Sequence, residues 1–243
     1  MTTAILPAAG TGSRLGRHEP KALVRIGAQT FLECALSKLT DCVDRVVIVV
    51  SEGAEPQFSA ELERIGWTRP TEIVTQHEPT GSADAVALGL GPVPAEEPCL
   101  VMWADQVGLS KETIRRVVDI LHQGHRQLIL PRVEVTRPYV WLRISSDGNV
   151  TVGRQRDNDA PPPVGFSDVG LFGFIAATGR ECIKAAFPSD SVSCRERDFI
   201  YVIPSFAQLV GVLPISAARA ETLAVNTPEE FDLAVRAVGA GRS

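Results

Sequence analysis

Two segments near the N-terminus decide the fold: TAILPAAGTGSRLG at residues 3–16 and PKAL at residues 20–23. The first begins with an apolar run of strand length, and closely spaced glycines follow it. Glycine reaches positive φ at low cost and lets backbone N–H groups approach a phosphate, and a helix behind such a loop adds its dipole. Arg14 and Lys21 supply two positive charges, which suit a triphosphate better than the pyrophosphate bridge of a dinucleotide. The two segments therefore predict a transferase that uses a nucleoside triphosphate.

Two better-known glycine motifs do not fit this loop. The dinucleotide fingerprint G-x-G-x-x-G would need a glycine at the position of Leu15, and its ribose-binding acid has no clear candidate. A Walker A string, G-x-x-x-x-G-K-[ST], does not occur in the chain. The remaining alternative is a glycine-rich turn that binds nothing, and the strand-to-helix context favours phosphate binding over it.

Length and composition indicate one α/β domain over residues 1–243, since 243 residues with 44% hydrophobic content can bury a substantial core. We expect residues 1–125 to form a nucleotide-binding half and residues 126–243 an acceptor-binding half that does not fold independently. The formal net charge of −5 argues against a nucleic-acid partner. Oligomeric state stays open at this point, with a homodimer as one option.

The N-terminus has no basic segment before its first apolar run, which is too short to span a membrane. We therefore expect no signal peptide, no membrane segment and a cytoplasmic location. The five cysteines include no C-x-x-C pair, so we expect reduced, mostly structural thiols rather than a disulfide framework or a zinc site.

Strands and helices alternate along the first half of the chain, which predicts a doubly wound, mostly parallel sheet with helices on both faces. The expected strands are residues 3–7, 45–50, 72–75 and 99–103, and the expected helices are residues 30–39, 82–90 and 111–122. The second half is less regular. There the patterns predict strands at 127–135, 141–144 and 169–174, an exposed loop at 158–163, and helices near 179–186, 196–204 and 228–237.

Polar residues follow the apolar runs at the points where these strands end. In open α/β sheets ligands bind outside the carboxyl ends of the strands. Gln76 and Gly81 follow one strand, Asp105 follows another, and Asn226 follows a late apolar step. Asp105 and Asn226 could each simply cap a helix, but together they offer the hard oxygen ligands that Mg²⁺ prefers. Their common placement at strand ends predicts a site.

These motifs resemble the sugar-nucleotide pyrophosphorylases and related nucleotidyltransferases. The resemblance rests on A-A-G-x-G-x-R-L-G followed by P-K-A-L, on Gln76 with GSADA at 81–85, on WADQ at 103–106, and on VN at 225–226. It covers nearly the whole chain and is closest to the uridylyltransferase domain of the bifunctional N-acetylglucosamine-1-phosphate enzyme. The fold that it implies is Rossmann-like and similar to that of GT-A glycosyltransferases.

The resemblance implies roles for individual residues. Arg14 and Lys21 would be catalytic, and Asp105 and Asn226 would hold Mg²⁺. Gln76 and Gly81 would read the base, with UTP favoured over CTP. The reaction would be in-line attack of a phosphate monoester oxygen on the α-phosphorus of the NTP, with loss of pyrophosphate. The implied nucleotide-binding residues are Leu6, Ala8, Ala9, Gly10, Thr11, Gly12, Ser13, Gln76, Gly81 and Ser82.

The acceptor half departs from the family pattern. A Gly-Tyr-Gly-Arg segment of the family is replaced by VWLR at 140–143. A glutamate expected to bind sugar hydroxyls is replaced within GRQR at 153–156, and an expected asparagine is replaced by Asp168. The implied acceptor-binding residues are Arg143, Asp168 and Glu196. Trp141 with Arg154 and Arg156 would fit a different or more anionic acceptor than a sugar-1-phosphate, such as another phosphate or a phosphonate.

Four alternatives remain. A methylerythritol-phosphate cytidylyltransferase would carry an Asp-Ala-Ala-Arg-Pro string where WADQ stands, and a molybdopterin nucleotidyltransferase fits residues 81–85 poorly. A glycosyltransferase would use a D-x-D metal motif, which Asp157-Asn158-Asp159 imitates weakly. A catalytically silent nucleotide-binding regulator would not need Lys21, Arg14 and Asp105 together.

Overall fold

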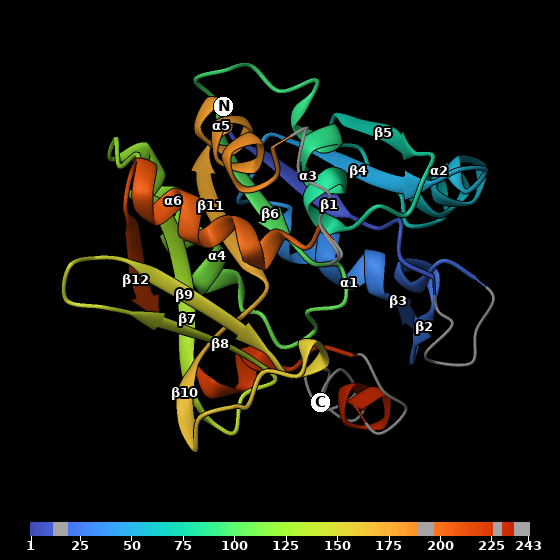
Figure 1. Cartoon of the computed structure of the whole chain (residues 1–243). Helices are drawn as coiled ribbons and strands as arrows, with labels where there is room; N and C mark the ends of the chain where they lie inside the picture. The colour runs from blue at the N-terminus through green and yellow to red at the C-terminus, as the bar shows by residue number, and fades with distance from the viewer. Residues whose placement is uncertain (12–18, 189–196, 226–229, 236–243) are drawn as a thin grey trace.

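The computed structural model describes residues 1–11, 19–188, 197–225 and 230–235 of the chain (Figure 1). Its central sheet has ten strands. Four of them pair in parallel in the order β5-β4-β1-β6: β1 (Thr3–Pro7), β4 (Arg45–Ser51), β5 (Thr71–Gln76) and β6 (Pro98–Met102). Residues 46–50 of β4 are all fully buried, as expected for a continuous β-branched run inside a parallel sheet.

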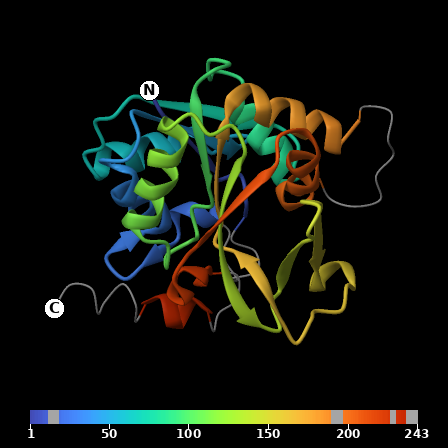
Figure 2. The same cartoon turned by 90° about the vertical axis from the view of Figure 1, so that its left-hand side faces the viewer.

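Helices cover both faces of this sheet, as expected. Leu6 of β1 shares one core with α1 (Phe31–Leu39), α2 (Glu55–Arg64) and α4 (Lys111–His122). Its neighbour Ile5 points to the opposite face and shares a second core with α3 (Ser82–Leu90), α5 (Ala176–Ala186) and α6 (Ile203–Leu209). Figure 2 shows the sheet nearly edge-on, with α4 on one side and α5 and α6 on the other.

The second half extends the sheet with antiparallel pairs. β11 (Leu171–Ile175) lies antiparallel to β6, and β7 (Leu128–Thr136) continues beyond it. An arm of three strands then follows, β10 (Val164–Asp168), β8 (Val140–Ile144) and β9 (Val150–Arg154), while β12 (Val212–Ser216) pairs in parallel with β7. β10 and β8 are joined at a single residue pair, Phe166 with Leu142.

Several elements differ from the prediction. α2, β9, β10 and β12 were not expected, and neither was the short hairpin of β2 (Arg25–Ile26) and β3 (Gln29–Thr30). The helix expected at 196–204 is wrong over its described part, because residues 197–198 are not helical and the α-helix spans Ile203–Leu209. Residues Phe199–Val202 form a 3-10 turn. Pro204 lies in the first turn of α6 instead of ending a helix, because proline is tolerated there, where its missing N–H needs no partner.

Of the helix expected at 228–237, residues 230–235 are helical and the rest lies outside the described residues. The cysteines Cys34, Cys42, Cys99 and Cys182 are buried free thiols, and burial raises the pKa of Cys99 to about 12. No helix among the described residues has both the length and the apolar composition that a membrane-spanning helix requires.

Candidate active site

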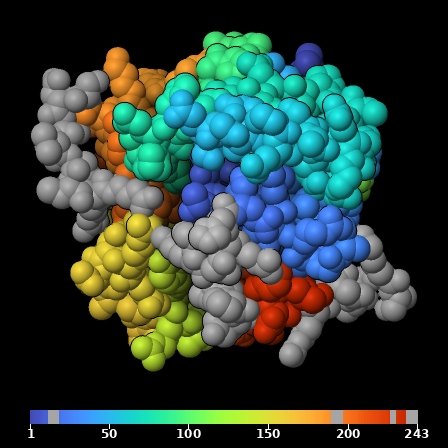
Figure 3. All heavy atoms as spheres, turned by 90° about the vertical axis from the view of Figure 1, so that its right-hand side faces the viewer, coloured from blue at the N-terminus to red at the C-terminus, as the bar shows by residue number. Residues whose placement is uncertain are grey.

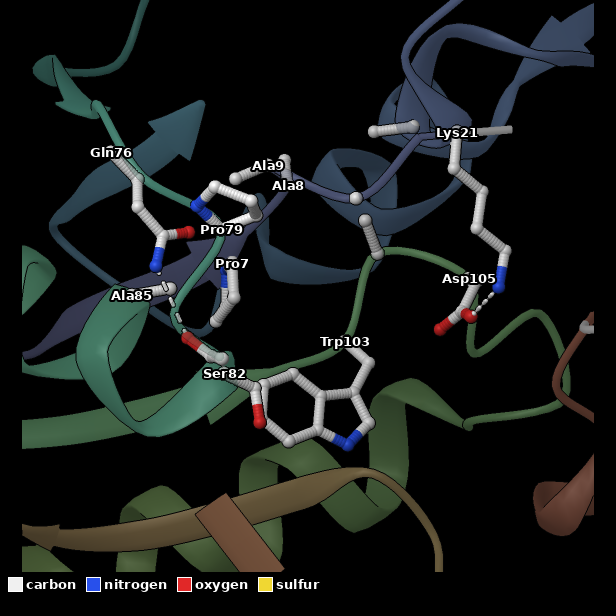
Figure 4. Close-up of a pocket in the computed structure, with 14 residues that line it drawn as sticks. Pro7, Ala8, Ala9, Lys21, Gln76, Pro79, Ser82, Ala85, Trp103 and Asp105 are labelled. Carbon is white, nitrogen blue, oxygen red and sulfur yellow. Dashed lines mark hydrogen bonds and ion pairs between the residues drawn. The ribbon is translucent and has the colours of Figure 1, made fainter. Parts of the chain in front are cut away.

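A small cavity of about 280 Å³ lies where β1, β5 and β6 end (Figure 4). Its lining consists of Pro7, Ala8, Ala9, Gly10, Lys21, Ala22, Gln76, Pro79, Gly81, Ser82, Ala85, Trp103, Ala104 and Asp105. Residues from four separate segments therefore meet at the carboxyl edge of the parallel strands, where α/β sheets bind ligands.

The glycine loop after β1 is closed at its base. Thr11 and Pro20 form an antiparallel bridge, and the Lys21 N–H donates to the Gly10 carbonyl oxygen at 3.0 Å. A short 3-10 turn, Lys21–Leu23, begins at this point. The closure places Lys21 beside the start of the loop, and its side chain reaches across the cavity to form an ion pair with Asp105 (Figure 4).

Asp105 lies three residues beyond the end of β6, on a segment that is held from behind. The half-buried Lys38 of α1 donates from Nζ to the carbonyl oxygens of Gln106 at 3.0 Å and Val107 at 2.8 Å. Burial lowers the pKa of Lys38 from its usual 10.5 to about 8. Gln106 also forms a backbone bridge with Ala224, which brings the end of the described segment 197–225 next to Asp105.

Gln76 and Gly81 lie together on one wall of the small cavity. Gln76 is 7% exposed, and its Nε2 donates to the Gly81 carbonyl oxygen at 3.2 Å, which fixes the orientation of the amide. Gly81 has φ of +127°, and a Cβ at this position would lie 2.3 Å from the Arg197 carbonyl oxygen. Only glycine fits here, because both the backbone conformation and the space exclude a side chain.

Ser82 begins α3 directly after Gly81. Its Oγ donates to Asp198 Oδ1 at 2.6 Å and accepts from the Phe199 N–H at 2.9 Å. The side chain thus contacts the second half of the chain, although Ser82 also lines the small cavity.

A large cavity of about 730 Å³ adjoins the small one, and both are lined by Trp103 and Asp105. Its other lining residues are Gln106, Tyr139, Val140, Arg154, Arg156, Ser167, Asp168, Asp198, Ile200, Thr222, Ala224 and Glu230. In the space-filling view of Figure 3, the yellow residues of the arm lie below the cyan and blue residues of the first half.

Asp168 is the last residue of β10 and lines the large cavity. Its Oδ1 accepts from the Gly170 N–H at 2.8 Å, and burial raises the pKa of its carboxyl group. A second acidic segment, Asp157-Asn158-Asp159, has a structural role: Asp157 pairs with the Arg154 guanidinium, and Asp159 accepts from the Arg154 N–H at 3.1 Å. These carboxylates do not form a glycosyltransferase metal motif, because both are engaged by Arg154.

Most of the expected site residues that the structure describes line the two cavities, and the exceptions are Leu6, Thr11 and Arg143. Leu6 is fully buried, and its side chain packs in the core rather than in the cavity. Arg143 lies on β8 in a separate hollow of about 510 Å³, with Arg132, Trp141 and Phe166, and so it is not placed beside Asp168. Trp141 shares that hollow, so it does not accompany Arg154 and Arg156 in the large cavity. Thr11 is exposed at the base of the glycine loop.

Some expected site residues lie outside the described residues, and some residues of the cavities were not expected. Gly12, Ser13, Arg14, Glu196 and Asn226 lie in the segments that the structure does not describe. Conversely, the sequence prediction did not include Trp103, Pro79 and Ala85 in the small cavity, or Tyr139 and Asp198 in the large one. Trp103 could have been found, because it directly follows the buried run of β6.

Magnesium fits the donor chemistry of this site. Within the described residues there is no group of three His, Cys, Asp or Glu side chains that could enclose a metal. Mg²⁺ seldom uses such a cage, and it is usually bound through one or two carboxylates together with substrate phosphates and water. The half-buried Asp105 carboxylate beside the glycine loop matches that pattern.

A glycine loop, a lysine–aspartate pair and an amide-bearing wall at the carboxyl edge of an α/β sheet are typical of nucleotidyltransferases. Residues 4–177 match the family model of the MobA-like NTP transferase domain. The chain therefore belongs to this family and is a nucleotidyltransferase, which confirms the predicted class.

Individual relatives support this assignment. The chain is 34% identical over 166 residues to the 2-C-methyl-D-erythritol 4-phosphate cytidylyltransferase of Rhodococcus jostii, covering 68% of this chain and 70% of that protein. It is 28% identical over 234 residues to the bifunctional protein GlmU of Thermus thermophilus, covering 93% of this chain but only 49% of GlmU.

A solved structure of UDP-glucose pyrophosphorylase complexed with UDP-glucose superposes over the whole of both chains with a TM-score of 0.77 at 16% identity. At that identity the likeness concerns the fold alone, and it confirms the predicted fold class.

Proposed function

We propose that this nucleotidyltransferase transfers a nucleoside monophosphate from an NTP, with UTP favoured, to a sugar-1-phosphate or a similar small phosphate or phosphonate acceptor. The observation that carries the proposal is the Lys21–Asp105 ion pair at the junction of the two cavities. The small cavity would take the nucleotide and the large one the acceptor. The reacting phosphorus would then lie beside Lys21.

The proposed reaction needs no nucleophile from the protein. A phosphate oxygen of the acceptor attacks the α-phosphorus and forms a new P–O bond, while the bond to the β-phosphate oxygen breaks and pyrophosphate leaves with the electron pair. Because the acceptor oxygen is already anionic, no proton has to be removed. Catalysis then depends on positioning and charge neutralisation, which dominate phosphoryl transfer in general.

Lys21 would supply the fixed positive charge, and Arg14 a second one. A magnesium ion, when bound, would be held by Asp105 and Asn226 and would add charge neutralisation at the phosphate oxygens. Lys38 would keep the Asp105 segment in place through the carbonyl oxygens that it binds.

Base recognition is proposed for Gln76. Its Nε2 is engaged by Gly81, which leaves Oε1 as a hydrogen-bond acceptor. This acceptor matches both the N3–H of uracil and the N4 amino group of cytosine. The second candidate function is therefore transfer of CMP to a non-sugar phosphate, which the 34% identity to a cytidylyltransferase favours.

The decisive experiment measures pyrophosphate release with Mg²⁺. UTP, CTP, dTTP, GTP and ATP are each paired with sugar-1-phosphates, other phosphate monoesters and phosphonates. Turnover with UTP and a sugar-1-phosphate supports the first proposal, and turnover with CTP and a non-sugar acceptor supports the second. Nucleotide binding without turnover across the whole panel would favour a silent regulator instead.

A further inference from the structure

One carboxylate joins the two cavities. Asp198 lines the large cavity, and its Oδ1 accepts from Ser82, a residue of the small cavity that lies 116 positions earlier in the chain. Its Oδ2 accepts from Nη1 of Arg154 on the arm. Both oxygens of this side chain are therefore used to connect the first half to the arm.

The backbone reinforces the connection on the nucleotide side. The Ala83 N–H donates to the Arg197 carbonyl oxygen at 2.8 Å, and the same carbonyl lies against Gly81. The Phe199 N–H donates to Ser82 at 2.9 Å. Residues 197–199 are thus fixed to the start of α3, beside the wall that Gln76 and Gly81 form.

Arg154 completes the connection on the acceptor side. It is 5% exposed, and its Nε and Nη2 bind the two oxygens of Asp157 at 2.9 and 3.2 Å. Asp157 also accepts from the Tyr201 hydroxyl. Two carboxylates therefore hold the Arg154 guanidinium, so it fixes the wall of the large cavity and is not available to hold the acceptor's phosphate. Charge-assisted bonds of this kind are strong and directional.

We infer that Asp198 is a positioning residue that couples nucleotide binding in the small cavity to acceptor binding in the large one. Because Ser82 and Arg154 bind the same carboxylate, a shift of either side moves the other. Binding of one substrate then favours the arrangement of the other cavity that the second substrate needs. The resulting change in affinity corresponds to a coupling free energy between the two sites. The inference rests on the proposed function of the two cavities.

The test measures each substitution on the substrate of the opposite cavity. In Asp198→Asn the amide can still accept from Ser82 but presents N–H groups to Arg154, which has no acceptor to offer. We expect the Kd of the nucleotide, measured by calorimetry with UTP or CTP and Mg²⁺, to rise about fivefold or more. The exposed Asp147→Asn at the β8–β9 turn removes the same charge and should leave this Kd unchanged.

The reverse experiment uses Ser82→Ala, which should raise the KM of the acceptor about fivefold, although Ser82 lines the small cavity. Both the nucleotide Kd and the acceptor KM are then measured for the double variant. Neither value should exceed that of the more affected single variant, because both substitutions act through one connection. Thermal melting of each variant separates coupling from loss of fold.

Three results would overturn the inference. Substitutions that affect only the substrate of their own cavity, or that add independently in the double variant, refute the coupling while leaving the proposed function intact. Failure of the unaltered protein to bind any nucleotide overturns both.

Discussion

The two cavities are built from different materials. The small cavity is walled mainly by main chain and short side chains, among them Pro7, Ala8, Ala9 and Gly10. The large cavity is more than twice its volume, about 730 against 280 Å³, and is walled by charged side chains such as Arg154, Asp168 and Asp198. A backbone wall can bind a triphosphate whatever group is attached to it, whereas charged side chains discriminate by hydrogen-bond partner and charge.

This difference between the cavities indicates which substitutions should affect nucleotide use and which should affect acceptor use. Substitutions of the backbone and of Lys21 in the small cavity should change how fast any nucleotide reacts, whereas only Gln76 there should change which base is preferred. Substitutions in the large cavity should change which acceptor is used. Five predictions test this division.

The largest effect is expected for Lys21→Ala, because it removes the fixed positive charge between the cavities. Turnover should fall by at least ~100-fold, by analogy with other preorganised electrostatic groups. Pyrophosphate release measures the loss. The matched control is Lys111→Ala, which breaks a lysine–aspartate pair with Asp41, and neither of these residues lines a cavity. Equal activity in both variants would contradict the assignment of Lys21.

The second-largest effect is expected for Gly81→Ala. An added Cβ would meet the Arg197 carbonyl oxygen, and φ of +127° is strained for alanine. We expect a cost of about 1–3 kcal/mol and a nucleotide Kd raised about tenfold or more. Gly53→Ala isolates the backbone strain, since Gly53 has φ of +76° with no atom within 4 Å of an added Cβ. If the two variants lose the same stability and affinity, the contact with Arg197 is unimportant.

Gln76→Ala should relax base selection without weakening phosphate binding. The ratio of kcat/KM between the preferred and the second NTP should fall about tenfold, because a single hydrogen bond to the base is lost. Gln57→Ala, on the exposed part of α2, serves as the control. A uniform loss with every NTP would show that Gln76 supports the loop rather than the base.

Lys38→Met should change the pH dependence of stability. Since the pKa of Lys38 is lowered to about 8, the unfolded chain holds more protons than the folded one between pH 8 and 10.5. From pH 7 to pH 9, the free energy of unfolding of the unaltered protein should therefore rise by about 1 kcal/mol relative to that of Lys38→Met. Denaturant titrations at both pH values measure it, and a difference that stays constant with pH would contradict the lowered pKa.

Arg143→Ala is expected to have the smallest effect. Because Arg143 lies outside both cavities, the acceptor KM should change less than about twofold, which is within the range of ordinary surface substitutions. A tenfold change would mean that the acceptor extends into the hollow between β8 and β10.

Sequence reasoning succeeded where the signal was local. The run before Asp105 predicted a central strand and the placement of Asp105 at its end, and the limits of α3 match the prediction at both Ser82 and Leu90. Parallel strands share one carboxyl edge, so Lys21, Gln76 and Asp105 could be expected to meet. The side chain of Leu6 does not reach the cavity, because β1 is buried on both of its faces and Leu6 packs in one of the two cores.

The acceptor side could not be predicted in the same way. β8 and β10 share a single residue pair, so no repeating pattern in the sequence fixes which side chains of the arm face the cavity. The contacts of Asp198 join residues that are 44 and 116 positions apart, and nothing in either segment indicates the other.

The closed base of the glycine loop separates the stability of the protein from its catalytic sequence. Gly10 and Thr11 are held to Pro20 and Lys21 by the Thr11–Pro20 bridge and by the bond from the Lys21 N–H to the Gly10 carbonyl oxygen. Lengthening a chain segment whose ends are already held together costs little, about 0.6 kcal/mol for each doubling. Insertions between Thr11 and Pro20 should therefore leave the melting temperature nearly unchanged while they impair turnover, because Arg14 lies in this part of the sequence.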